Sequence, residues 1–82
     1  MTSPDPLLLD LRDGDSPVLP LLVRRALALL APGQQLEVRL TSPCWARDLP
    51  VIVRRGGDRC LHCRQGAQGY SLLLARGGGE RG

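Results

Sequence analysis

Three cysteines and one histidine are the residues of this chain that could support metal or sulfur chemistry. Cys60, His62 and Cys63 form a Cys-Leu-His-Cys segment, a spacing known from redox and metal motifs. We predict that this segment lies in a strand, where residues three apart point to opposite faces of a sheet. Zinc would also require four ligands, and the sequence contains no second cysteine pair. We therefore expect no metal site, no redox dithiol and no cofactor here.

Ser16 is a candidate nucleophile at the start of a predicted helix. It precedes Pro17, and this pair predicts a helix that is capped by the serine hydroxyl and begins at the proline. A serine nucleophile needs a base and a third group, and the only histidine, His62, follows much later in a predicted strand. The favoured interpretation of Ser16 is therefore a helix cap.

Cys44 is the other candidate nucleophile. It follows Ser42 and Pro43, which repeat the combination of cap and proline at the start of a second predicted helix. If the first two strands are parallel, Ser16 and Cys44 open helices at the same edge of the sheet. The simpler alternative to a reactive thiol at this edge is a partly buried cysteine beside Trp45.

Apolar spacing along the chain predicts the elements that position these residues. Strands are expected where apolar residues run together or alternate, and helices where they recur every three or four residues. Pro20 falls at the fourth position of the first helix and predicts an irregular first turn, while Pro50 is expected to bend or shorten the second helix. The predicted strands are 7–11, 36–40, 59–64 and 70–76, and the first of them is expected to be buried. The predicted helices are 17 to about 30 and 44–55, and residues 65–69 are predicted to form a hairpin loop.

These elements predict an α/β fold of the α+β two-layer type. The order is β-α-β-α-β-β, in which β-α-β units imply parallel pairing with right-handed crossovers, and the last two strands form an antiparallel hairpin. The economical arrangement is a mixed four-stranded sheet with both helices on one face. Residues 7–76 would form this single domain, preceded by a loose lead-in over 1–6 and followed by a flexible glycine-rich tail over 77–82.

The composition restricts the classes of function. The 82 residues are 43% hydrophobic and 23% charged, as in a soluble globular domain, and no apolar run approaches the roughly 20 residues of a membrane span. No secretion signal is evident, and an odd number of cysteines does not predict a disulfide framework, so we expect a cytoplasmic protein without membrane contact. All basic residues are arginines spread along the chain, and aromatic residues are scarce, which argues against nucleic-acid binding.

A series of short motifs resembles the TusA-like (SirA-like) family of small sulfur carriers over residues 7 to 76. The motifs are, in order, Asp10-Leu11-Arg12, Ser16-Pro17, Ala26-Leu27, Pro32-Gly33, Thr41-Ser42-Pro43, Arg47-Asp48-Leu49-Pro50, Arg54 and Gly57. The resemblance implies the same order of strands and helices. It also implies that position 16 is where relatives carry sulfur, as a persulfide on a cysteine that opens the first helix.

The serine at position 16 changes what this resemblance implies. Ser16 cannot hold a persulfide, and Asp13 and Asp15 add carboxylates that would oppose an anionic sulfur nearby. We therefore expect a non-catalytic accessory domain that binds a protein partner of a sulfur-relay or redox system, and not an enzyme. One alternative is a sulfur carrier that uses Cys44, and another is an RNA-binding module. The expected binding edge consists of Arg12, Ser16, Pro17, Cys44, Arg47 and Asp48.

Overall fold

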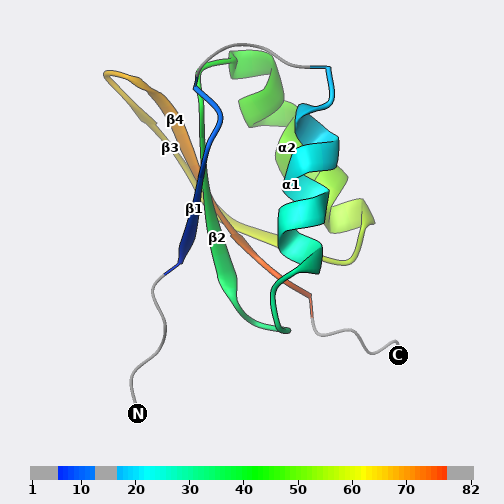
Figure 1. The fold of residues 1–82 in the computed structure, drawn as a ribbon. Coiled ribbons are helices and arrows are strands. Elements are labelled where there is room, and N and C mark those ends of the chain that lie inside the picture. The colour runs from blue at the N-terminus through cyan, green and yellow to red at the C-terminus, as the bar shows by residue number, and fades with distance from the viewer. Residues whose placement is uncertain (1–5, 13–16, 78–82) are drawn as a thin grey trace.

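The fold is a two-layer sandwich of a four-stranded sheet and two helices (Figure 1). A computed structural model describes residues 6–12 and 17–77, and all structural statements below concern these residues. The predicted β-α-β-α-β-β order is confirmed. The elements are β1 (Leu7–Asp10), α1 (Leu19–Ala28), β2 (Gln35–Leu40), α2 (Pro43–Arg55), β3 (Arg59–Gly66) and β4 (Gly69–Ala75).

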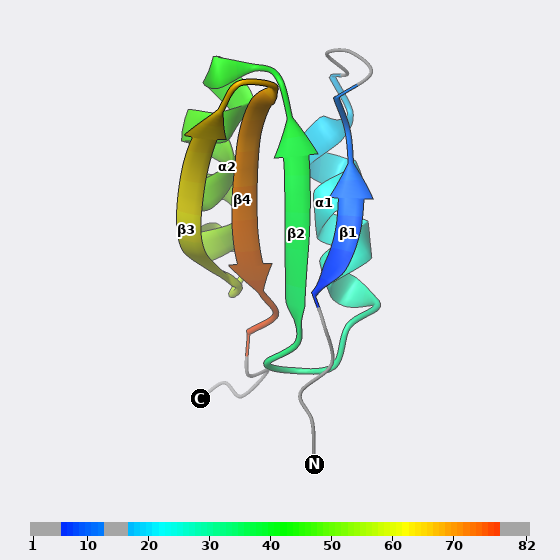
Figure 2. The same ribbon diagram turned by 90° about the vertical axis from the view of Figure 1, so that its left-hand side faces the viewer.

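The sheet is mixed, as the sequence predicted. Its strand order is β1-β2-β4-β3, with β1 parallel to β2 and with β4 antiparallel to both of its neighbours. Both helices cover one face, and Figure 2 looks onto the opposite face, with the helices behind the sheet. We call this uncovered side the open face.

The core lies between the helices and the covered face of the sheet. Alternate residues of the two central strands point into it, because side chains along a strand alternate between faces. The helices contribute residues at spacings of three and four, which form one side of each helix. The buried residues of this core include Leu36, Val38, Leu40, Leu72 and Leu74 from the sheet and Leu19, Val23, Leu27, Ala46, Leu49 and Val53 from the helices.

Helix α1 begins two residues later than predicted. Its N-cap is Val18, not Ser16, and its first backbone hydrogen bond runs from the Leu22 amide to the Val18 carbonyl over 3.0 Å. This start places Pro20 in the first turn, where a missing N–H leaves no helical bond unmade. The predicted start at Pro17 is therefore wrong, and Ser16 lies outside the described residues.

Helix α2 begins as predicted and continues through its proline. The Ser42 hydroxyl caps it by accepting a hydrogen bond from the Trp45 amide over 3.3 Å. The helix runs for 13 residues with Pro50 inside it, so this proline does not shorten it. None of the helices in the described part of the chain is long and apolar enough to cross a membrane.

Strand β1 is at an edge of the sheet, and the prediction that it is buried is wrong. Leu7 and Leu8 are 56% and 52% exposed. Strand β1 pairs on one side only, with β2, so its other edge is open to solvent, and Leu8 pairs with Glu37 on the open face of the sheet. A run of leucines therefore marked a strand correctly but did not reveal its place in the sheet.

The turn between β3 and β4 is shorter than the predicted loop. The strands extend to Gly66 and from Gly69, leaving only Ala67 and Gln68 between them. Gly69 has a φ of +124°, and a Cβ built there would lie 2.5 Å from the Leu40 carbonyl oxygen. The hairpin therefore approaches the end of β2 closely, which only glycine allows at this position.

The chain after β4 is held against two neighbouring segments. Arg76 donates to backbone carbonyls at the end of α1, at Leu27, Ala28 and Leu30. Gly77, the first residue of the predicted tail, is buried, and its amide donates to the Asp58 carboxylate over 2.8 Å. Residues 78–82 of that tail lie outside the described part of the chain.

Candidate functional site

The predicted binding edge lies where both helices begin. Strands β1 and β2 are parallel, so their carboxyl ends meet at one end of the sheet, and α1 and α2 both start there (Figure 1). Pro17 precedes α1, Cys44 is in the first turn of α2, and both are exposed. The turn that carries Ser16 lies outside the described residues. We call Arg12, Pro17, Cys44, Arg47 and Asp48 the helix-start edge.

The charged residues of the helix-start edge fall into two groups. On α2, Arg47 Nε lies 3.6 Å from a carboxylate oxygen of Asp48, and these side chains are 79% and 52% exposed. Such an exposed pair contributes little to stability and leaves both charges open to a partner. Arg12 instead binds Asp10 through two nitrogens, over 2.9 and 2.8 Å, and donates to the Gln68 side chain over 2.9 Å.

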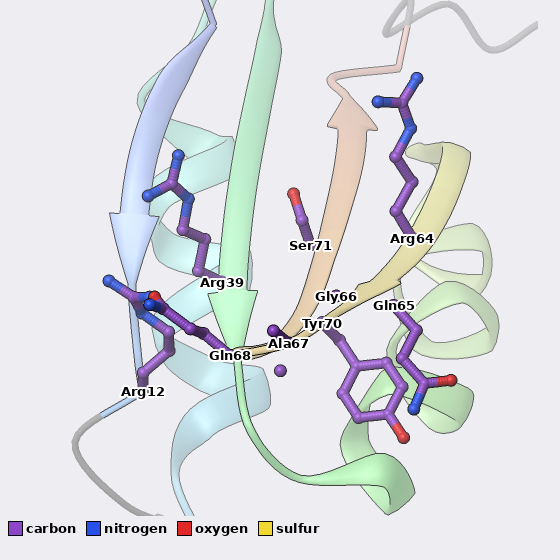
Figure 3. A pocket seen from close by; sticks show the side chains of 10 residues that line it. Arg12, Arg39, Arg64, Gln65, Gly66, Ala67, Gln68, Tyr70 and Ser71 are labelled. Carbon is purple, nitrogen blue, oxygen red and sulfur yellow. The ribbon is translucent and has the colours of Figure 1, made fainter.

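These contacts connect Arg12 with a groove on the open face. The hydrogen bond between Arg12 and Gln68 joins the end of β1 to the turn of the hairpin, as Figure 3 shows. The groove has a volume of about 450 Å³, and Arg39, Arg64 and Ser71 also line it. We call these five residues the arginine groove. Its volume is in the range of small-molecule sites, although it is open along the sheet.

Strand register explains why these side chains meet. Arg39 pairs with Ser71, which pairs with Arg64, and residues directly opposite one another share a face of the sheet. Figure 3 shows Ser71 between the two arginines. Glu37, also on the open face, accepts from Arg39 over 2.9 Å and from Ser71 over 3.1 Å. The face therefore carries a network of charged and polar groups, as expected for a sheet face in contact with water.

The carboxylates in this network stay ionised to low pH. The side-chain hydrogen bond from Arg12 is the main reason that the pKa of Asp10 is lowered from 3.8 to about 2. The hydrogen bond from Arg39 lowers the pKa of Glu37 against the opposing effect of burial. Each carboxylate thus offsets the charge of one arginine. Within the described residues, Arg64 has no ion pair, so it supplies the uncompensated positive charge of the groove.

Arg12 belongs to the predicted binding edge, whereas Arg39 and Arg64 were not predicted as site residues. Apolar and polar residues alternate along 36–40, which predicts that Arg39 lies on the face of the strand that is turned away from the core. This alternation was the signal from which its position could have been found. Its neighbours depend on two strand pairings: that of β3 with β4, which was predicted as a hairpin, and that of β4 with β2, which no local pattern specifies.

The cysteines of β3 lie differently from our prediction. The register shifts at Leu61, so that Cys60 pairs with Leu74 and Cys63 with Leu72. Both partners are buried on the covered face, and therefore both cysteines belong to that face. The expectation that they lie on opposite faces is wrong, because a β-bulge inserts one residue and restores the alternation after it.

The two cysteines differ in exposure, and Cys63 affects the pKa of Cys60. Cys60 packs partly against the core, and its sulfur donates to the His62 carbonyl over 3.7 Å, whereas Cys63 is exposed. Burial is the main cause that raises the pKa of Cys60, and electrostatic repulsion by the neighbouring Cys63 is the next. His62 pairs with Leu73 and belongs to the open face. Across residues 6–12 and 17–77, no group of three or more His, Cys, Asp or Glu side chains could hold a metal ion.

Comparison with known proteins does not identify a family. No family model matches the chain, and no curated protein matches its sequence. Any functional assignment therefore depends on the residues themselves and on their arrangement.

Proposed function

We propose that this protein is a TusA-like accessory domain that binds a protein partner of a sulfur-relay or redox system without carrying sulfur at position 16. The observation that carries this proposal is Ser16 itself. It stands immediately before Pro17, at the position where the resemblance implies a persulfide-bearing cysteine. The β-α-β-α-β-β order is the one that the resemblance implies, which supports the assignment. Three free cysteines accord with a cytoplasmic, reducing setting.

The helix-start edge is the proposed docking surface. Cys44, Arg47 and Asp48 are exposed on α2, and Pro17 is exposed before α1. Because the ion pair of Arg47 and Asp48 is long and solvated, a partner could replace it at little cost. Exposed charges of this kind direct partner choice and association rate more than affinity.

Affinity capture with charge-reversed variants tests the docking surface. Full-length protein and its Arg47→Glu variant would be used as bait in native cell extract, with quantitative mass spectrometry of the bound proteins. Arg25→Glu is the matched control, since Arg25 is exposed in the last turn of α1, at the opposite end of the helix. We expect a persulfide-handling or thiol-redox protein that binds wild type and Arg25→Glu and is depleted with Arg47→Glu. Retention by Arg47→Glu, or capture of no protein of this kind, would contradict the proposal.

Cys44 as the sulfur acceptor is a second candidate function. Its thiol is exposed in the first turn of α2, at the end of the molecule where α1 also begins. Transfer from a donor persulfide would form a new S–S bond at Cys44 as the donor S–S bond breaks: R–S–SH and Cys44–SH give R–SH and Cys44–S–SH. The donor supplies the sulfur atom, and no external oxidant is needed.

Intact mass spectrometry separates the two candidates. After incubation with a persulfide donor, an acceptor role predicts one added sulfur atom in wild type, and none in Cys44→Ser. The same adduct in Cys60→Ser and Cys63→Ser would assign it to Cys44. The absence of a stable adduct on wild type favours the accessory role.

A further inference from the structure

We propose that Cys60 and Cys63 form a two-thiolate site for a monovalent thiophilic metal ion, Cu(I). The proposal rests on the bulge in β3, which brings both cysteines to the covered face of the sheet. It does not depend on the proposed function, because the pair lies on β3 and the helix-start edge contains neither residue.

The spacing of the two thiols suits a bridging ion. Cys60 and Cys63 pair with Leu74 and Leu72, which are two residues apart on β4. Two residues of strand span about 6.6 Å between Cα atoms, close to the upper limit of about 6.8 Å for a disulfide. The side chains also rise from the same face, which separates their Cβ atoms more than a disulfide favours. An ion with two bonds of about 2.3 Å to sulfur joins sulfurs about 4–4.6 Å apart, a separation within reach of two cysteines on one face whose Cα atoms are about 6.6 Å apart.

The surroundings provide access and charge. Cys63 is exposed, so an ion or a metal donor can reach the pair from solvent, while half-buried Cys60 packs against the core and holds its position. Binding would release one proton from each thiol: two R–SH and Cu⁺ give (R–S–Cu–S–R)⁻ and two H⁺. The product carries one negative charge. Arg54, in the last turn of α2, acts on Cys60 with a positive charge and would offset it.

The donor set selects the kind of metal. Soft thiolates favour Cu(I), which is satisfied by two sulfur ligands in a linear arrangement. Zinc requires four ligands, and the described residues contain no group of three His, Cys, Asp or Glu side chains that could supply them. His62 belongs to the opposite face of the sheet and cannot join the pair.

Competition with a chelator tests the site. The reduced full-length chain would be titrated with Cu(I) under anaerobic conditions against bathocuproine disulfonate, with ultraviolet absorption recorded for thiolate-to-copper charge transfer. We expect one ion per chain and a charge-transfer band. Mutation of a residue that only orients a metal ligand lowers metal affinity by about 10- to 100-fold. Loss of a ligand itself should cost more, so Cys60→Ser and Cys63→Ser should each weaken Cu(I) binding by at least about 100-fold. Cys44→Ser should leave affinity unchanged.

Several outcomes would overturn the proposal. One is equal binding by wild type and Cys63→Ser, a surface variant that we expect to fold because this side chain is exposed. Another is loss of binding in Cys44→Ser. A third is a copper-dependent dimer in size-exclusion chromatography, which would mean that the ligands come from two chains. Formation of a Cys60–Cys63 disulfide on exposure to oxidised glutathione, without copper binding to the reduced chain, would instead assign the pair to thiol–disulfide exchange.

Discussion

Replacement of Arg76 by methionine should destabilise the protein strongly, because this side chain caps α1 from a distant part of the chain. One nitrogen, Nη1, donates to the carbonyls of Leu27, Ala28 and Leu30 over 3.1, 2.6 and 2.9 Å. The last carbonyls of a helix have no partner within the helix, and the negative end of the helix dipole lies there. Methionine keeps most of the apolar stem of Arg76 and removes both the donor and the charge.

The magnitude follows from the geometry. A nitrogen with two hydrogens cannot form three full hydrogen bonds, so the contacts amount to about one charged hydrogen bond that is shared among three acceptors. Such a bond contributes about 1.5–3 kcal/mol, and the charge at the helix end adds about 0.3–1 kcal/mol. We expect Arg76→Met to lower the free energy of unfolding by about 2–4 kcal/mol. For a domain of 82 residues, with a total of about 4–12 kcal/mol, this is a large fraction.

Urea denaturation followed by circular dichroism measures this loss. With a slope of about 1 kcal/mol per molar urea, the midpoint should fall by about 2–4 M and the slope should not change. Arg25→Met is the matched control, because Arg25 is an exposed arginine in the last turn of the same helix, and this substitution should cost no more than about 0.5 kcal/mol. Arg76→Lys should lie between wild type and Arg76→Met. Equal midpoints for Arg76→Met and Arg25→Met would refute the capping argument.

Two further predictions concern the hairpin and the end of β1. Gly69→Ala should lower the free energy of unfolding, measured by urea denaturation, by about 2–5 kcal/mol, because alanine is strained at a φ of +124° and its Cβ would lie 2.5 Å from the Leu40 carbonyl oxygen. Gly66→Ala is the control and should be nearly neutral, since a Cβ at Gly66 meets open space. Equal losses for the two variants would contradict this reasoning. The carboxyl of Asp10 should titrate by NMR with a pKa of about 2 and move toward 3.8 in Arg12→Met. Since folding lowers this pKa, the ionised Asp10 carboxylate stabilises the folded state above about pH 4, and this stabilisation is lost as the pH falls toward 2. An unchanged pKa of Asp10 in Arg12→Met would show that the hydrogen bond from Arg12 is not the cause of the shift.

Local patterns determined which elements form and in what order. Serine followed by proline at 42–43 marked the start of α2 correctly, because capping depends on a few neighbouring residues. The same pattern at 16–17 misplaced the start of α1 by two residues. Pro20 explains this shift, because a proline has no backbone N–H to donate. In a helix that began at Pro17, the first intrahelical hydrogen bond would have to come from the residue at position 20, whereas in the observed helix Pro20 lies in the first turn and no bond is lost.

The amino-acid sequence by itself determined the element order, the two layers and the apolar character of the core, because these depend on the period of apolar residues along the chain. Only the tertiary structure decided which residues stand side by side across the sheet. The order β1-β2-β4-β3 brings Arg39, Ser71 and Arg64 together on the open face, and one extra residue at Leu61 brings two cysteines to the covered face. Strand order and register arise from contacts between segments far apart in the chain, and a shift of one residue moves every side chain after it to the other face.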